Sequence, residues 1–402
     1  MRVAINATSA KMGGAATYLF NLLPQLVRQL EGDRESSIVV WTGPDVGRLS
    51  GLHRRVEVRT HEGAANGGLR RLLFDQLELP SALRRGAFDV LFSSANLGPL
   101  RSPCRQVLLV RNPIYFSPEY ERRMVNRRVK LRLRFQRWLT LRAIEGADHV
   151  LFPTRAMMTM VASYIPGPRA NWSVAPYGAR HDLFSPSPSG DEGRARTATV
   201  RLLHVSHYCD QKNLGTLLHA LALLDQRHPG KYHLTLTAGL EGLRDQSNPH
   251  CPSLPEDRRL LRRLDSRGVV TDLGAVSYEA LPERYRRADL FVFPSYTESF
   301  GHPLVEAMAS GLPVVAADVP VNREMCGDAA AFFPTFDSPA LAELIEGLTT
   351  RRAGLGAMCE SGLVRSAEFT WERHAAQLVA AMHGGEQLEP APDFGRGQVL
   401  GR

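Results

Sequence analysis

Two glutamates flank the start of an expected helix in the most informative segment of the sequence, Phe291–Val315. Glu298 lies in a polar loop that follows an apolar strand, and Glu306 falls in the predicted first helical turn. Pro303 suits that turn because its missing N–H would be unpaired there, and Gly311 suits the left-handed residue that ends a helix. Taken singly, Glu306 is an acid that the helix dipole favours and Glu298 a solvated loop residue. Together they predict a site for paired hydroxyl groups.

The backbone at the start of the same helix supplies a second kind of binding group. Ligands of open α/β sheets bind at the carboxyl ends of strands, where this loop lies. Free N–H groups at a helix N-terminus attract phosphates and hydroxyls. Here they are expected at Phe300, Gly301, His302 and Leu304. Gly301 would also let a ligand approach the backbone closely.

A lysine marks a second strand-to-helix junction, in the segment HVSHYCDQKN at 204–213. Lys212 is expected at a helix N-terminus, where a cation alone is unfavourable and an anionic ligand would reverse the penalty. The alternative is a solvated surface lysine. The sequence contains no D-x-D motif to hold a divalent ion on a diphosphate, so we expect no metal at this site.

The elements that must position these residues alternate between apolar runs and amphipathic helical patterns. This alternation predicts an α/β protein with mainly parallel sheets. A chain of 402 residues exceeds what one core usually supports. We therefore expect an N-terminal Rossmann-like domain at 1–178, a polar linker at 179–198, a second such domain at 199–370, and a disordered tail at 385–402.

The segment Phe291–Val315 resembles the E-x7-E signature of the family 4 retaining glycosyltransferases, in which Glu298 and Glu306 match the two glutamates. The likeness covers nearly the whole chain. Gly13-Gly14 is similar to the first glycine loop of the family, and Trp371-Glu372 to the start of its C-terminal helix. The resemblance implies the GT-B architecture, in which two Rossmann-like domains face each other across a cleft and a helix at about 371–384 returns to the first.

The resemblance also implies roles for the residues singled out above. Glu306 would hold the ribose hydroxyls of the donor, and Glu298 those of its sugar. Lys212 would stabilise negative charge on the leaving diphosphate. The amides of Phe300–Leu304 would contact the sugar and phosphates. The segment Gly274–Val276 would line the base pocket, with Val276 as the side chain singled out there.

The sequence departs from the family at two places. Ser206-His207 stand where the family has Gly-Arg, and His207 is neutral at pH 7 unless phosphates raise its pKa. After the strand at Gln106–Val110, Arg111-Asn112 occupy the place of a histidine-acid pair that faces the transferred sugar. With Gly13 and Gly14, they are the residues expected near the acceptor or the donor phosphates.

The charge is divided unevenly along the chain. Residues 1–180 carry 27 Lys and Arg against 13 Asp and Glu, which predicts an anionic partner for this half. An Arg-rich but inert surface is the alternative.

Nine basic residues lie in Arg122–Arg142 alone, with apolar residues at helical spacing among them. Those apolar residues are Met124, Leu131, Phe135 and Trp138. The segment is a cationic helix face for an anionic membrane or acceptor, a helix whose apolar stripe packs on the sheet, or both at once. No nucleic-acid-binding module accompanies the charge, so nucleic acid is not expected.

Several classes of protein are excluded. No apolar run approaches the roughly 18 residues of a membrane span, and the N-terminus resembles a strand rather than a signal peptide. Together these observations predict a cytoplasmic protein that is at most peripheral at the inner membrane face. Five scattered cysteines without a C-x-x-C pair predict neither disulfides nor a zinc site. No G-x-G-x-x-G follows a strand, which argues against a dinucleotide oxidoreductase.

The predicted function is therefore a metal-independent, retaining transfer of a hexose from a UDP- or GDP-sugar, without further cofactor, to a hydroxyl acceptor. Glycan, glycolipid and glycosylated natural-product assembly all fit. The alternatives are a non-catalytic sugar-nucleotide-binding subunit, or another GT-B enzyme such as a sugar-nucleotide epimerase or a phosphorylase.

Overall fold

The computed structural model describes residues 1–9, 14–32, 35–44, 51, 53–61, 68–165, 170–186, 199–240, 250–351 and 354–385. By their internal contacts these residues form two compact units. The first contains Met1–Phe116, Arg134–Gly178 and the described residues from Thr370 onward. The second contains Ser117–Leu133 and Ala179–Phe369.

The first unit is built on a parallel sheet of seven strands in the order β3-β2-β1-β4-β5-β6-β7. Its central strands are buried on both faces, which explains why they read as continuous apolar runs. The strands are β1 Arg2–Ala7, β2 Ser37–Thr42, β3 Val56–Thr60, β4 Val90–Ser93, β5 Arg105–Leu109, β6 His149–Phe152 and β7 Trp172–Val174.

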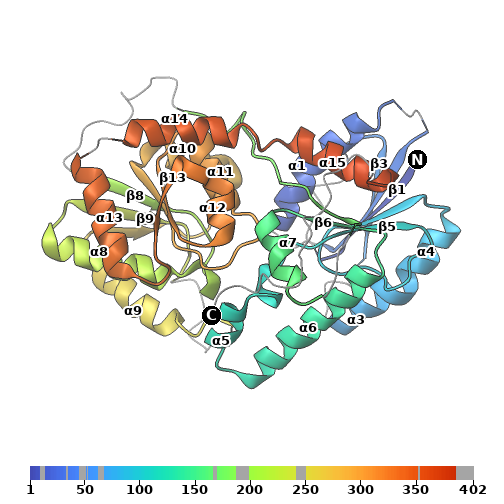
Figure 1. Cartoon of the computed structure of the whole chain (residues 1–402), viewed down its shortest axis with the longest axis horizontal. Helices are drawn as coiled ribbons and strands as arrows, with labels where there is room; N and C mark the ends of the chain where they lie inside the picture. The colour runs from blue at the N-terminus through green and yellow to red at the C-terminus, as the bar shows by residue number, and fades with distance from the viewer. Residues whose placement is uncertain are drawn as a thin grey trace. The chain divides into compact units, whose positions relative to one another are not determined.

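Helices connect these strands, and the last helix of the chain joins the same unit. They are α1 Gly14–Gln29, α3 Gly68–Leu73, α4 Leu79–Arg85, α6 Arg127–Glu145, which begins in the second unit, α7 Arg155–Ala162 and α15 Trp371–His383. Figure 1 shows α15, red at the end of the chain, beside α1 in blue. The Tyr18 hydroxyl donates to Nε2 of buried His374 at 2.8 Å, because Nδ1 of that ring donates to the Ala175 and Pro176 carbonyls.

The second unit is built on a six-stranded parallel sheet in the order β10-β9-β8-β11-β12-β13. Its strands are β8 Val200–His204, β9 Tyr232–Leu236, β10 Val270–Asp272, β11 Leu290–Phe293, β12 Val314–Ala317 and β13 Ala330–Phe333. Its helices are α5 Pro118–Arg123, α8 Leu214–Arg227, α9 Leu254–Asp265, α10 Leu281–Arg287, α11 His302–Ala309, α12 Pro320–Cys326, α13 Ser338–Arg351 and α14 Leu355–Ser366.

The predicted fold class is confirmed: both units are α/β with parallel, Rossmann-like sheets. Two segments differ in detail from the expected boundaries. Ser117–Leu133 packs with the second unit, although we expected it in the N-terminal domain. Ala179–Pro186, the described part of the expected linker, also packs there, with Phe184 buried against Tyr278 and Tyr285. The rest of the linker and all but the first residue of the expected tail lie outside the described residues. Among the helices that are described, none is long and apolar enough to cross a membrane.

A close backbone contact joins the segment after β7 to the start of α15. A Cβ at Gly178 would lie 2.1 Å from the Trp371 nitrogen and 2.5 Å from the Thr370 carbonyl carbon. Since backbone cannot yield as a flexible side chain does, we expect Gly178→Ala to lower the free energy of unfolding by about 3 kcal/mol, measured by denaturant titration. Gly347→Ala is the control, because a Cβ there meets nothing within 4 Å and helix α13 should gain about 1 kcal/mol. Equal effects of the two variants would contradict this account.

Candidate functional site

Two neighbouring strands of the second unit bring the predicted lysine and the first glutamate together. β8 and β11 pair directly, so the turn after β8 and the loop after β11 leave the sheet side by side. The Lys212 Nζ donates to Glu298 Oε1 at 2.5 Å, and the two side chains are only 13% and 12% exposed. Burial alone would lower the Lys212 pKa, but the adjacent Glu298 carboxylate outweighs it and raises that pKa. The ammonium is therefore charged at neutral pH.

The turn that carries Lys212 is held by its neighbours. Asp210–Lys212 forms one turn of 3-10 helix, and Asn213 adopts a left-handed conformation (φ 52°) before α8 begins at Leu214. The Asn213 side-chain amide donates to the Pro294 carbonyl at 3.2 Å, at the end of β11. Lys212 thus lies just before the N-terminus of α8, where we expected it. Its charge is compensated by Glu298 and its side chain is largely buried, so the alternative of a solvated surface lysine is wrong.

Glu306 is buried inside α11, at its fifth residue, and not in the first turn as expected. Its Oε2 accepts a hydrogen bond of 3.0 Å from the Tyr285 hydroxyl. Burial raises the Glu306 pKa to about 7, and hydrogen bonds from Tyr285 and Tyr278 offset part of that rise. The carboxyl group is therefore partly protonated near neutral pH, which suits a group that exchanges hydrogen bonds with ligand hydroxyls.

The start of α11 has the geometry expected of a ligand loop, with one correction. Gly301 is the N-cap residue in a left-handed conformation (φ 82°), and a Cβ there would lie 3.0 Å from Leu304 Cδ1. The Leu304 N–H already donates to the Gly301 carbonyl at 2.9 Å, so it is not available to a ligand as predicted. The Phe300 ring is buried and packs edge-on against Phe369 and His302, which fixes the path of the loop.

The residues that replace the family's Gly-Arg lie at the exit of β8. His207 is exposed; its partial loss of hydration and then the nearby Lys212 charge lower its pKa, so the ring is neutral at pH 7. His204 is buried: Nδ1 donates to the Val292 carbonyl and Nε2 accepts from the Ser206 hydroxyl at 2.8 Å. His207 can therefore offer a hydrogen bond here, but not a fixed positive charge.

An aspartate that the sequence analysis did not select organises the expected base pocket. Asp272 ends β10, and its carboxylate accepts from the N–H groups of Gly239, Leu240 and Gly274 at 2.8–3.1 Å. Gly239 and Gly274 both have positive φ, and the loops after β9 and β10 are thereby joined. Val276, the residue predicted to line the pocket, is half-buried in the second of these loops.

The predicted acceptor residues lie in the first unit. Gly13 lies outside the described residues, and Gly14 is the first residue of α1. The N–H groups of Arg111 and Asn112 both donate to Oδ1 of Asn96, at 2.9 and 3.0 Å. The Arg111 guanidinium lies 5.3 Å from the centre of the Tyr18 ring, next to the aromatic cluster at α15.

The basic segment forms the last two residues of α5 and most of α6, and its apolar stripe does not pack on the sheet. Leu131, Phe135 and Trp138 are 70%, 51% and 51% exposed, and the last two rings stack at 5.9 Å. The residues that do pack are Val129 and Leu133, on the opposite face of α6. The alternative in which the apolar stripe of Leu131, Phe135 and Trp138 packs on the sheet is therefore wrong. Of the four apolar residues selected from the sequence, Met124 is buried.

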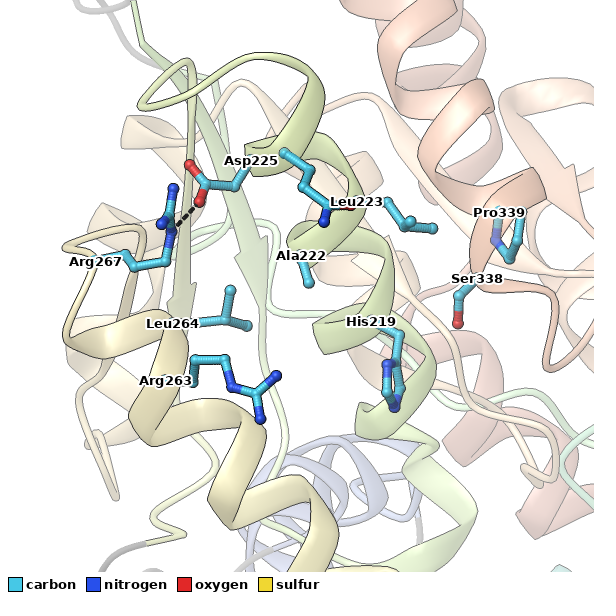
Figure 2. Close-up of a pocket in the computed structure, with 10 residues that line it drawn as sticks. His219, Ala222, Leu223, Asp225, Arg263, Leu264, Arg267, Ser338 and Pro339 are labelled. Carbon is cyan, nitrogen blue, oxygen red and sulfur yellow. Dashed lines mark hydrogen bonds and ion pairs between the residues drawn. The ribbon is translucent and has the colours of Figure 1, made fainter.

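A groove of about 520 Å³ opens elsewhere on the second unit, between α8, α9 and the start of α13, and none of the predicted ligand residues lines it. Figure 2 shows its charged wall, where Arg267 pairs with Asp225. Within the described ranges, no three His, Cys, Asp or Glu side chains gather in a way that could hold a metal ion.

Comparison with known proteins covers both halves of the chain. A model of Glycosyltransferase Family 4 matches residues 12–183, and a model of Glycosyl transferases group 1 matches residues 192–357. The chain is 31% identical over 179 residues to the O-antigen chain mannosyltransferase B of Escherichia coli, covering 44% of each protein. It is 28% identical to a D-inositol 3-phosphate glycosyltransferase of Arthrobacter sp. over 250 residues, 60% of this chain and 57% of that protein. The chain thus spans about half the length of these curated relatives.

Solved structures support the same architecture. Sucrose-phosphate synthase from Thermosynechococcus elongatus superimposes with a TM-score of 0.73 at 19% identity, over 95% of this chain and 98% of that one. Anabaena HepE in complex with UDP and glucose gives a TM-score of 0.69 at 20% identity, over 95% and 99% of the two chains. At these identities the likeness shows the fold.

The raised pKa of Glu306 makes stability depend on pH. The folded state holds this proton up to about pH 7, while an unfolded glutamate loses it near pH 4.3, so the stabilising contribution is complete below about pH 4.3 and is lost as pH rises through about 7. Glu306→Gln mimics the protonated group. The variant's free energy of unfolding minus that of the parent protein should increase by up to about 3 kcal/mol between about pH 4.5 and 8, measured by denaturant titration. Exposed Glu360→Gln is the control. Parallel pH profiles for Glu306→Gln and the parent would contradict the burial argument.

Proposed function

Because this chain belongs to the family 4 glycosyltransferases of the GT-B fold, we propose that it transfers a hexose from a nucleotide-diphosphate sugar to a hydroxyl acceptor, with retention of anomeric configuration. The observation that carries the proposal is the buried ion pair between Lys212 and Glu298, at the carboxyl ends of two neighbouring parallel strands. That edge is where open α/β sheets bind their ligands.

The two groups of the pair fit the two parts of such a donor. An ammonium binds diphosphate oxygens, and a carboxylate accepts hydrogen bonds from sugar hydroxyls. In the free protein each group is the partner of the other, which offsets part of the cost of removing both charges from water. A donor would replace this single contact by two: Lys212 to the diphosphate and Glu298 to the sugar. Structural neighbours in complex with UDP and glucose and with UDP-glucose support a uridine nucleotide in the donor, with a guanosine nucleotide as the alternative.

The remaining residues complete the proposed donor site. Glu306 would accept hydrogen bonds from the ribose hydroxyls, which favour the ionised carboxylate and so would lower its pKa. His207 would donate one hydrogen bond to the diphosphate. Gly301 would let the donor approach the backbone, and Gly274–Val276 would line the base pocket that Asp272 shapes. No cofactor and no metal ion enter this proposal.

The transfer step needs electrostatic help at the leaving group. The bond between the anomeric carbon and the diphosphate oxygen breaks while the acceptor oxygen bonds to the same face of that carbon. The acceptor proton passes to the departing phosphate oxygen. Charge grows on the diphosphate, where the fixed Lys212 ammonium would stabilise it in a poorly hydrated site. Relatives named as a mannosyltransferase and as inositol phosphate glycosyltransferases support a glycan or polyol acceptor, which Arg111 and Asn112 of the first unit would face.

Neutralising the pair one member at a time tests the proposal. Lys212→Gln and Glu298→Gln should each lower kcat/KM by about 100-fold or more, measured as nucleoside diphosphate release over a nucleotide-sugar panel. Each single change should also destabilise the fold by about 3 kcal/mol, because it leaves one buried charge unpaired.

The double variant Lys212→Gln/Glu298→Gln separates chemistry from stability. It removes both charges, so the free energy of unfolding should recover while turnover stays low. Lys231→Gln, at the opposite end of the second sheet beside β9, is the matched control and should behave as the parent. Turnover restored in the double variant would contradict the assigned roles, and donor binding without turnover in the parent would favour the non-catalytic subunit.

We also propose that α6 holds the enzyme at the inner face of an anionic membrane. Successive helical residues lie 100° apart, so Leu131, Phe135 and Trp138 share one narrow face. The exposed Arg128 and Arg134 lie on its two sides. Stacked aromatic rings flanked by guanidinium groups fit the interface of a bilayer that carries anionic headgroups.

Vesicle sedimentation tests this second proposal. The parent should bind vesicles containing phosphatidylglycerol and lose binding to pure phosphatidylcholine or at high salt. Leu131→Ser/Phe135→Ser/Trp138→Ser should weaken binding by about 100-fold, because each of the three exposed side chains contributes about 1 kcal/mol when it enters the bilayer interface. Leu69→Ser, a similarly exposed leucine on α3, is the control. Equal binding of both variants would remove α6 as the contact surface.

A further inference from the structure

A buried aspartate lies between the two loops that carry the ion pair. Asp210 is two residues before Lys212, and its side chain is 0% exposed. Its Oδ2 accepts a hydrogen bond of 2.6 Å from the hydroxyl of Tyr296, which is two residues before Glu298. The Tyr296 N–H also donates to the Gln211 carbonyl at 3.0 Å. The two loops are therefore joined through Asp210.

The cation that neutralises Asp210 comes from a distant part of the chain. Arg123, the last residue of α5, places its Nε 3.0 Å from Oδ2 of Asp210. Its Nη2 donates to the Ser253 hydroxyl at 3.1 Å, and that hydroxyl in turn donates to Oδ1 of Asp210 at 3.1 Å. A buried carboxylate needs such partners to stay ionised, and the planar guanidinium supplies several at fixed angles.

Aromatic rings hold the guanidinium in place. Its central carbon lies 5.5 Å from the ring centre of Tyr296 and 4.9 Å from that of Phe336, within the range of cation–π attraction. Phe336 adopts a left-handed backbone conformation (φ 69°), which costs free energy for a bulky side chain. Such a conformation persists where the surroundings fix it, and here the stack of Arg123 on Phe336 and Tyr296 is part of those surroundings.

A second contact ties α5 to the same loop. The Thr297 hydroxyl, next to Glu298, donates to the Ser117 hydroxyl at 2.8 Å, and both groups are buried. Ser117 is the N-cap residue of α5 and also accepts from the Tyr120 N–H. Both ends of α5 thus touch residues one or two positions away from Glu298 or Lys212, which explains why this segment belongs to the second unit.

We propose that Arg123 is a positioning residue for the donor site. Through Asp210 and Tyr296 it fixes the distance between the turn that carries Lys212 and the loop that carries Glu298. The inference rests on the proposed function for the role of that pair, whereas the linkage between the loops rests only on the contacts above. Arg123 touches neither the donor nor the reacting atoms, so its loss should act through geometry.

Three variants at and beside this position test the proposal. Arg123→Met keeps the length of the side chain without its charge, and Arg123→Lys restores a charge without the planar fork. Arg122→Met is the matched control, because Arg122 is the preceding residue and its side chain is 74% exposed. The parent and each variant are compared by hydrogen–deuterium exchange of the segments 206–213 and 294–301, and by the KM and kcat for the nucleotide sugar.

Arg123→Met should speed exchange in both segments and raise the donor KM by about 10- to 100-fold, with a smaller change in kcat. Arg123→Lys should recover part of each effect, and Arg122→Met should match the parent. If Arg123→Met does not fold, Tyr296→Phe replaces it, since this change removes only the hydroxyl that bonds Asp210. Tyr296→Phe should likewise speed exchange in both segments and raise the donor KM.

The outcomes separate this inference from the proposed function. A parent protein that turns over no nucleotide sugar would defeat the proposed function, while faster exchange in both segments of Arg123→Met would still support the linkage. An active parent whose Arg123→Met and Tyr296→Phe variants keep the parent's KM would overturn the positioning role. Exchange that changes in neither segment, or only around α5 itself, would overturn the linkage.

Discussion

The pairing of β8 with β11 is the constraint on which the candidate site depends. Parallel neighbours end at the same edge of a sheet, so residues 86 positions apart in the chain, Lys212 and Glu298, leave the sheet together and form an ion pair. Removed from water, each charge requires the other. A ligand that carries both an anion and hydroxyl groups satisfies the same requirement with two contacts instead of one.

The loops around this pair are held by buried polar contacts in addition to the packing of the Phe300 ring. Asn213 bonds the end of β11, Asp272 joins the loops after β9 and β10, and Asp210 collects Tyr296, Ser253 and Arg123. Hydrogen bonds depend on direction, whereas apolar contacts tolerate sliding. Loops fixed in this way keep their geometry without filling the space that a substrate needs, which is the condition for a preorganised site.

The residues assigned to the donor and to the acceptor in the proposal lie in different units. The second unit holds every predicted donor residue, and its sheet carries the only described loops that the proposal assigns to nucleotide and sugar. The first unit contributes Arg111, placed over Tyr18, and most of the arginine-flanked apolar face of α6. A basic, partly apolar surface on that half agrees with the excess of Lys and Arg in residues 1–180, and supports a partner with phosphate or lipid character.

The sequence alone determined the alternation of strands and helices and the α/β class, and it identified the segment from Phe291 to Val315. These features follow from local signals: the spacing of apolar residues, and Gly301, Pro303 and Gly311 at the ends of a helix. It also selected Lys212, Glu298 and Glu306. Only the tertiary structure decided what these residues do to one another. Strand order pairs Lys212 with Glu298, and burial in α11 moves the Glu306 pKa to about 7. Arg123 bonds Asp210, 87 residues further along the chain, and Leu131 faces solvent. Both facts depend on how helices and loops pack together, which no local sequence pattern records.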